Sequence, residues 1–283
     1  MASVEPVVTV ALGLALGFVV GISGVGGGAL MAPALYVVVG LPFAEAVTLA
    51  LLYSIFTKIA GFLTHLRQGT VHWPITLRYG LAAIPGAILG SQLVYAAKGA
   101  ERPFALVMGV ALVAAALLLL LETALAVRAG RKRSSHIDAE AADGLVEAVV
   151  ARRRRPLDPD RIGLRGGAAL AVFSFSVGIV LGITSVGSGS IIVTSMLLLL
   201  EMPAARIVGS NVAIGLMMVV PAGITHFLAG GVDGQRLLLL VGGSLFGTVL
   251  GSRATLVVPE RGLRVAVALL VLLSAAATIA KAW

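Results

Sequence analysis

The sequence predicts an all-α polytopic membrane protein, with about 8–10 transmembrane segments arranged in two homologous, inverted repeats. Three observations lead to this fold class: an apolar composition, ten separate hydrophobic stretches, and an internal repeat at one constant offset. The chain is 59% hydrophobic and 12% charged, whereas soluble domains are about 25% charged, and its mean hydropathy is +1.05. A soluble globular domain and a disordered chain are therefore excluded, and the lack of cysteine excludes disulfides, thiol catalysis and thiolate-bound metals.

A helix that crosses a bilayer needs about 20 apolar residues. In the first half of the chain, apolar stretches lie at 5–22, 26–40, 44–66, 74–97 and 103–127. In the second half they lie at 164–183, 187–200, 204–229, 235–257 and 262–281. The stretches 26–40 and 187–200 are short, and each is either a tilted short helix or a half-helix that enters and leaves the membrane on the same side.

A basic loop divides the chain into a first transmembrane repeat at 1–128, a loop at 129–163 and a second transmembrane repeat at 164–283. Of the 21 lysines and arginines, 10 lie between Arg128 and Arg165. Because basic loops stay on the cytoplasmic side, we expect a multi-pass protein of the plasma (inner) membrane with this loop in the cytoplasm. Five segments in each half then place both termini outside, whereas four in each half would change this orientation. The expected partners are the lipid bilayer, a small anionic substrate and coupling protons, with no nucleic acid and no cofactor, and the oligomeric state stays open.

The two halves are related by adding 161 to each residue number, without a gap over about 75 residues. Proline, histidine and glycine pairs that keep one register exceed what a glycine-rich composition produces by chance. Internal duplication is typical of secondary transporters, whose substrate sites lie near the bilayer midplane at interrupted helices. An odd number of segments in each half makes the halves inverted. The matching positions include Gly17 with Gly178, Pro42 with Pro203, Thr64-His65 with Thr225-His226, and Gly86 with Gly247.

Two glycine-rich runs occupy equivalent positions, at 23–28 and 184–190. Each glycine disfavours a helix by about 1 kcal/mol relative to alanine, so we expect the runs to break the helix and to free backbone N–H groups. A half-helix that begins at Gly28 or Gly189 would present its positive end to an anion. The alternative is a tight packing crossover without a ligand. Upstream of the runs, GxxxG-like pairs are expected to pack helices closely: Gly17 with Gly21, and Gly178 with Gly182.

Paired glycine-rich runs, each followed by a proline ten to fifteen residues on, in a duplicated apolar chain around a polar loop, resemble the sulfite exporter TauE/SafE family, also called the toluene sulfonate uptake permease family. The resemblance covers nearly the whole chain apart from 129–162. It implies movement of sulfur-containing anions such as sulfite, thiosulfate, sulfoacetate and other organosulfonates. The sequence departs from the family pattern at Ser185 and Ser188, where the first run has glycines. The polar pair expected early in the third helix of each half is Ser210-Asn211 in the second half and Leu49-Ala50 in the first.

Lys58 lies well inside the stretch 44–66, where a charged side chain is costly and is a functional hypothesis by default. A cation that faces a pore attracts a sulfonate or a sulfite. The alternatives are an ion pair with Glu45 or Glu122, or a side chain that snorkels to the interface. Three residues share its helical face: Ser54, Gly61 and His65.

Asn211 lies deep in the stretch 204–229, directly after Ser210. A hydrogen bond between helices is the structural alternative for such an amide. The position near the second glycine-rich run, in repeat register, favours a role in a binding pocket.

His65 and His226 are equivalent in the repeat, and each follows a threonine. A lone interfacial histidine is usually just solvated, whereas two at one repeat position indicate a gate or a proton relay. A metal site is not expected, because ligand spacing such as HxxxH is missing.

We therefore expect a secondary transporter of a small anion, working by alternating access and coupled to protons, with an anion channel as the alternative. An enzyme is not expected, because the spans lack paired carboxylates or a Ser/His/Asp set. The predicted substrate-binding residues are Ser23, Gly24, Gly26, Gly27, Gly28, Ser54, Lys58, Ser185, Gly187, Ser188, Gly189, Ser210 and Asn211.

Overall fold

The computed structural model describes residues 4–23, 28–97, 99–134, 163–187, 189–200, 202–230, 232, 234–254 and 260–283. The regular elements formed by these residues are all helices, and no strand occurs among them. The first half contains α1 (Val4–Ser23), α2 (Gly28–Ala34), the π-helical turn η1 (Leu35–Val39), α3 (Phe43–Arg67), α4 (Trp73–Ala96) and α5 (Glu101–Ser134). The second half contains α7 (Leu164–Thr184), α8 (Ser190–Leu199), α9 (Ala204–Gly230), α10 (Gly234–Ala254) and α11 (Glu260–Ala282).

Within the described residues, six helices are long and apolar enough to cross a membrane, and they lie in α3, α4, α5, α7, α9 and α11. Helices α1 and α10 have 20 and 21 residues, which corresponds to about 30 Å at the rise of an α-helix. Helix α8 and the pair formed by α2 and η1 are shorter, and they lie where the two short stretches were predicted. The prediction of an all-helical, multi-pass membrane protein is confirmed.

The helix boundaries follow the offset of 161 found in the sequence. Helix α3 begins at Phe43 and its counterpart α9 at Ala204, while α1 ends at Ser23 and its counterpart α7 at Thr184. The duplicated sequence therefore folds into duplicated helices of matching extent. The inverted relation of the two halves stays a prediction.

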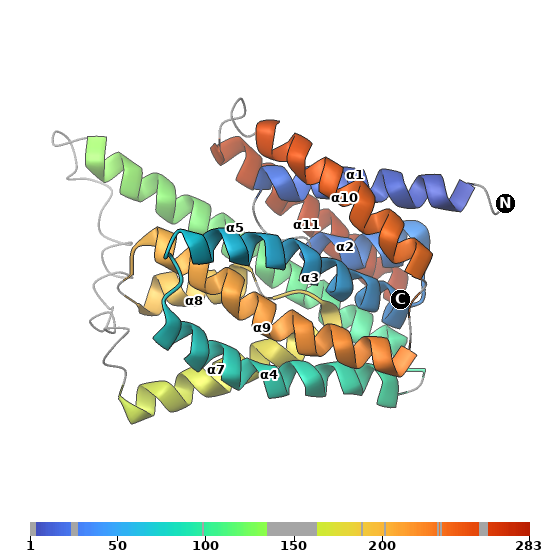
Figure 1. Cartoon of the computed structure of the whole chain (residues 1–283), viewed down its shortest axis with the longest axis horizontal. Helices are drawn as coiled ribbons and strands as arrows, with labels where there is room; N and C mark the ends of the chain where they lie inside the picture. Colours follow the sequence, from blue (N-terminus) through green and yellow to red (C-terminus); the bar gives the residue numbers. More distant parts are fainter. Residues whose placement is uncertain are drawn as a thin grey trace.

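The two halves of the sequence interleave in space. Helix α1 packs along α10, and α4 packs along α7, so each pair takes one helix from each half. Helices α3 and α9, and α5 and α11, also pair across the halves. Both chain ends lie at one end of the bundle, whereas α5 ends and α7 begins at the other (Figure 1). The predicted loop 129–163 begins within α5, which runs to Ser134, and its residues 135–162 lie outside the described part of the chain.

Small residues allow these helix pairs to touch backbone to backbone. A Cβ at Gly178 or at Gly182 of α7 would collide with carbonyl oxygens of α4, and a Cβ at Gly17 of α1 would collide with a carbonyl oxygen of α10. Close approach through small residues is how membrane helices associate. The packing role predicted for the GxxxG-like pairs is confirmed at these three positions, and the surroundings of Gly21 are outside the description.

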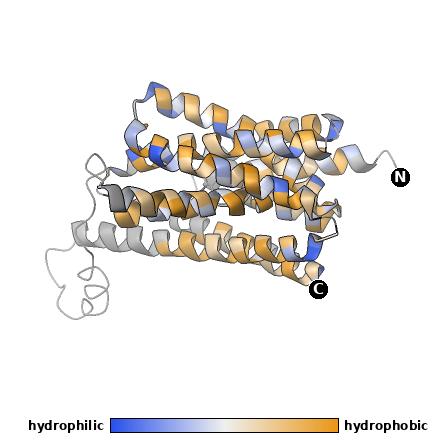
Figure 2. Ribbon diagram, turned by 90° about the horizontal axis from the view of Figure 1, so that it is seen from below, coloured by the Kyte–Doolittle hydropathy of each residue, from blue (hydrophilic) through white to orange (hydrophobic). Residues whose placement is uncertain are grey.

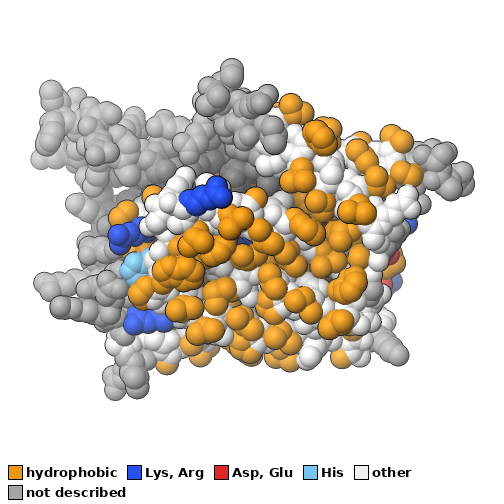
Figure 3. Space-filling view, viewed as in Figure 1, with side chains coloured by type: hydrophobic (Ala, Val, Ile, Leu, Met, Phe, Trp, Pro, Cys, Tyr) orange, Lys and Arg blue, Asp and Glu red, His pale blue; other side chains and the backbone are white. Residues whose placement is uncertain are grey.

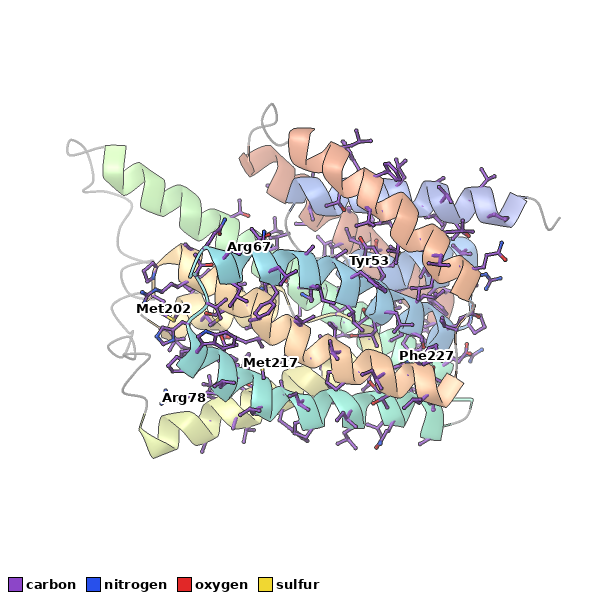
Figure 4. All side chains as sticks on the ribbon, in the orientation of Figure 1. Tyr53, Arg67, Arg78, Met202, Met217 and Phe227 are labelled. Atoms are coloured by element: carbon purple, nitrogen blue, oxygen red, sulfur yellow. The ribbon has the colours of Figure 1, made fainter. Side chains whose placement is uncertain are left out.

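Polar residues concentrate near the two ends of the bundle, and hydrophobic residues cover most of the length of the helices (Figure 2). On the face shown in Figure 3, hydrophobic side chains dominate and the lysine and arginine side chains gather toward the left end. Arg67, at the end of α3, and Arg78, near the start of α4, mark this end in Figure 4. It is also the end where α5 stops and α7 starts, which is the end predicted to face the cytoplasm.

Candidate functional site

Helices α7 and α8 form a hairpin inside the bundle. Tyr79 of α4 contacts both of them: its ring lies edge-on to Phe173 of α7 with centroids 6.5 Å apart, and its hydroxyl is 3.2 Å from Ser195 Oγ of α8. Helix α8 therefore turns back after the elbow instead of continuing in the direction of α7. The choice between a tilted short helix and a half-helix for the stretch 187–200 stays a prediction.

The elbow between α7 and α8 has an unusual backbone. Ser185 has φ +64° and Gly187 has φ +121°, a left-handed conformation that side chains disfavour. The Val186 N–H donates to Thr184 Oγ1 over 3.0 Å. Ser185 is 2% exposed, and its Oγ has no hydrogen-bond partner among the described atoms. The predicted helix break is confirmed here, because α7 ends at Thr184 and α8 begins directly after Gly189.

The first glycine-rich run interrupts the chain at the equivalent place. Helix α1 ends at Ser23 and α2 begins at Gly28. The described residues do not include three predicted ligands of this run, Gly24, Gly26 and Gly27. They also do not include Ser188 of the second run. The ligand role of both runs stays a prediction.

Helices α3 and α9, which are counterparts in the repeat, pack against each other in opposite directions. Figure 4 shows α3 running leftward from Tyr53 to Arg67 and α9 running rightward from Met217 to Phe227. The contacts agree with this antiparallel arrangement. Thr48, near the start of α3, meets His226, near the end of α9. Gly61, near the end of α3, meets Val212, near the start of α9. The predicted site residues on these two helices therefore lie along one antiparallel helix pair.

Lys58 reaches from α3 across to α9 at Gly215. A Cβ at position 215 would lie 2.7 Å from Lys58 Nζ and 3.1 Å from Lys58 Cε, so the glycine leaves the room that the ammonium occupies. The lysine is half-buried, and it lies about 200° around α3 from Phe56, whose side chain is 49% exposed on the outer face. The structure thus directs this cation to the helix pair and away from the surface.

The ammonium of Lys58 has no hydrogen-bond or ion-pair partner in the part of the chain that the structure describes. Of the two carboxylates considered as partners, Glu45 pairs instead with Arg236 over 2.7 Å, and the side chain of Glu122 is outside the description. Snorkelling along the helix is also not observed, because Nζ lies beside Gly215. An unpaired cation within a spanning helix is costly in the absence of a counter-charge.

Two further polar side chains lie near this ammonium and have unsatisfied atoms. Ser54 precedes Lys58 by one turn of α3, is 1% exposed, and its Oγ has no partner among the described residues. Asn211 precedes Gly215 by one turn of α9, is 8% exposed, and its Oδ1 also lacks a described partner. Ser210 differs, because its Oγ accepts the His72 N–H over 2.9 Å and so fixes the start of α4.

His226 is fully buried and joins four helices. Its Nε2 donates to the Gly182 carbonyl of α7 over 2.9 Å, and its Nδ1 is 3.1 Å from Thr48 Oγ1 of α3. Tyr95 of α4 lies edge-on to the imidazole, with its hydroxyl 2.9 Å from the same Thr48 oxygen. Both ring nitrogens are therefore engaged at the end of the bundle where α9 finishes.

His65 lies at the opposite end of the α3 and α9 pair and is only partly buried. Its Nδ1 is 2.9 Å from Thr70 Oγ1. That oxygen is 2.6 Å from the place that a Cβ at Gly209 would take, and position 209 is the repeat counterpart of Thr48. Each histidine thus meets a threonine at one end of the helix pair, although the two threonines come from different repeat positions.

Sequence reasoning did not single out Thr48, Tyr95 or Thr76, whose buried Oγ1 lacks a described partner. Thr48 resembles any membrane-helix threonine, because its hydroxyl donates to the Ala44 carbonyl one turn back. Thr48 differs from its repeat counterpart Gly209, but several other positions also differ between the halves, so this mismatch did not mark it. For metals, no cluster of three or more histidine, aspartate, glutamate or cysteine side chains occurs within the described residues.

The chain is similar to probable membrane transporters over most of its length. The sequence profile described as "Sulfite exporter TauE/SafE" matches residues 9–278. The probable membrane transporter protein YjnA of Bacillus subtilis (strain 168) is 29% identical over 268 residues, which cover 93% of this chain and 95% of that protein. The probable membrane transporter protein YunE of the same organism is 26% identical over 254 residues, which cover 87% of each chain. No solved structure matches the chain significantly.

Proposed function

The chain belongs to the sulfite exporter TauE/SafE family and is a multi-pass membrane transporter, and from this premise we propose that it moves a small anion past Lys58. The anion is a sulfur oxyanion or an organosulfonate, such as sulfite, thiosulfate or a sulfoacetate-like molecule. The observation that carries this proposal is the ammonium of Lys58, which lies beside Gly215 and has no partner among the described residues. The protein resides in the plasma (inner) membrane with 129–163 in the cytoplasm.

An anion supplies acceptors to the ammonium of Lys58 and to the unpartnered hydroxyl of Ser54. The ammonium brings charge and three donors, and Asn211, one turn from Gly215, can donate to the anion through Nδ2. The elbow lies toward the other end of the helix pair, where Gly182 meets His226. Its Ser185 hydroxyl and the start of α8 are proposed as a second contact on the anion's path, at an interrupted helix whose dipole favours negative charge. A sulfonate or sulfite presents several acceptor oxygens, which suits a set made of donors from more than one helix.

We propose that alternating access takes place at the two ends of the α3 and α9 pair, and the contacts of the two histidines support this. At one end His226 closes onto Thr48, and at the other His65 meets Thr70 over Gly209. In the proposed cycle the halves are inverted repeats, and one histidine contact opens while the other closes. Proton coupling supplies the driving force.

The proposal is tested with purified protein in proteoliposomes, by uptake of labelled sulfite, thiosulfate, sulfoacetate and taurine. Lys58→Met removes the charge at the site, and Lys281→Met is the matched control, because Lys281 is exposed near the end of α11 and stacks on Tyr36 at 4.2 Å. We expect Lys58→Met and Asn211→Ala to lose uptake while Lys281→Met keeps it. Equal uptake by Lys58→Met and wild type would refute the site. Unlabelled anion inside the vesicles should accelerate the uptake of labelled anion by a carrier, and the absence of this acceleration would favour a channel.

A further inference from the structure

We propose that Lys58 carries the proton that accompanies the anion. The ammonium holds the anion during the loaded half of the cycle. When the anion leaves, Lys58 releases one proton to water on that side, becomes a neutral amine and returns without charge. Water on the entry side then returns the proton. This inference rests on the proposed function, since it assigns a second task to the same side chain.

Carboxylates are the usual carriers of coupling protons in membrane proteins, but those described here are not placed for this task. The only carboxylates whose side chains the structure describes are Glu45 and Glu101. Glu45 is held by Arg236 over 2.7 Å near the start of α3. Glu101 is exposed in the first turn of α5. Neither lies beside Lys58 in the middle of the helix pair.

The described ionisable groups on the neighbouring helices leave Lys58 without a competitor. Helices α2, α5, α9, α10 and the turn η1 pack against α3, and α2 contributes no such group. None of the groups on the other elements pairs with Lys58. They are His226 and Arg206 on α9, Arg236 on α10, Glu101 and Arg102 on α5, and Tyr36 on η1.

His226 is a poor alternative carrier because of its contacts. Its Nε2 donates to the Gly182 carbonyl, and its Nδ1 faces Thr48 Oγ1. Thr48 has a single hydroxyl proton, and its oxygen also contacts Ala44 and Tyr95, so both ring nitrogens stay within protein contacts and the imidazole is fully buried. Lys58, which is only half-buried, is therefore better placed than His226 to exchange a proton with water.

The position of Lys58 makes loss of the proton the direct way to remove its charge. Lys58 lies nine residues before the end of α3 at Arg67, which is about 13 Å along the helix, and its Nζ points sideways to Gly215. The head group cannot follow the anion to water without leaving this contact. A lysine, unlike an arginine, can give up its proton when it is removed from water.

The charge moved in each cycle follows from this assignment. One proton accompanies one anion, so a monovalent sulfonate crosses without net charge. A divalent anion such as thiosulfate crosses with one net negative charge. Membrane potential should therefore change the rate for thiosulfate and leave the rate for a monovalent sulfonate unchanged.

The test uses methanesulfonate and thiosulfate, because neither takes up a proton near neutral pH and any proton that enters must be carried by the protein. Labelled anion and a pH-sensitive dye inside proteoliposomes report the two fluxes together. We expect one proton for each anion with either probe, and a response to potential with thiosulfate only. Uptake of either anion without internal acidification would overturn the assignment, whereas absence of all uptake and binding would instead refute the proposed function.

The variant Lys58→Arg separates binding from proton release, since a guanidinium keeps its charge. We expect this variant to bind the anion and to exchange labelled for unlabelled anion, while net uptake falls at least tenfold. Lys281→Arg is the matched control and should behave like wild type. In Lys58→Gln, residual uptake should run without acidification. Acidification that persists with the uptake of either Lys58 variant would assign the proton to another group and overturn the inference.

Discussion

The replacement Gly215→Ala tests the contact on which the anion site depends. The added Cβ would lie 2.7 Å from Lys58 Nζ, whereas non-bonded atoms settle at about 3.5 Å, so the ammonium must retreat by about 0.8 Å. That displacement stretches a charge-assisted hydrogen bond of about 2.8 Å beyond its useful range. Such a bond contributes about 1.5–3 kcal/mol, which corresponds to about 10- to 150-fold weaker anion binding. The helix itself should gain stability, because alanine is favoured over glycine by about 1 kcal/mol.

The assay compares anion affinity, measured by calorimetry on detergent-purified protein, with the thermal midpoint Tm of the same samples. Gly223→Ala is the matched control: it lies two turns further along α9, and its Cβ would meet the flexible ends of Ile55 and Leu52 at 3.0 and 3.5 Å. We expect Gly215→Ala to lose affinity at unchanged or higher Tm, and Gly223→Ala to keep it. Unchanged affinity in Gly215→Ala would refute the reasoning. An equal loss in both variants would show that helix separation, and not displacement of the ammonium, weakens binding.

Three further changes probe the framework and the elbow. Gly178→Ala should lower Tm and expression, by a cost of about 1–3 kcal/mol for overpacking against a backbone oxygen, while Gly167→Ala on the same helix, where a Cβ meets nothing within 4 Å, should not. His226→Phe should lower Tm through loss of buried hydrogen bonds worth about 1–3 kcal/mol, and His65→Phe should change it less; equal shifts would contradict the difference in burial. Ser185→Ala should leave Tm unchanged in thermal melts, because its Oγ has no described partner, yet reduce anion affinity; a drop in Tm alone would make it structural.

The sequence was sufficient to predict the helices, because hydropathy and the offset of 161 both act locally along the chain. The apolar stretches matched the helices closely, and the break after Thr184 was visible as a run of small residues. What the sequence could not state was the direction of α8 relative to α7. That direction is visible in the contacts of Tyr79, which lies more than 90 residues earlier in the chain and touches both helices.

The residues of the candidate site were predictable from the sequence, whereas the contacts between them were less so. Lys58 stood out because charge inside an apolar span is rare. Asn211 stood out because a deep amide follows Ser210 near the second glycine-rich run. The contact of Lys58 with Gly215 depends on how α3 packs against α9. The packing of two helices that are distant in the chain cannot be read from a single sequence. His226 was recognised, but its partner Thr48 was not, since threonines in helices often bond to their own backbone.

The interleaving of the halves restricts how a transport cycle can proceed. Glycine contacts lock α1 to α10 and α4 to α7 at backbone distance, so neither pair can slide without a collision between main chains. The α3 and α9 pair is different, because Gly61 meets a valine side chain and Gly223 meets side-chain ends of isoleucine and leucine. Side chains can change rotamer, whereas a carbonyl oxygen fixed in a helix cannot move aside. The proposed alternation therefore takes place along α3 and α9, where Lys58 lies, and the two glycine-locked pairs form the frame against which these helices move.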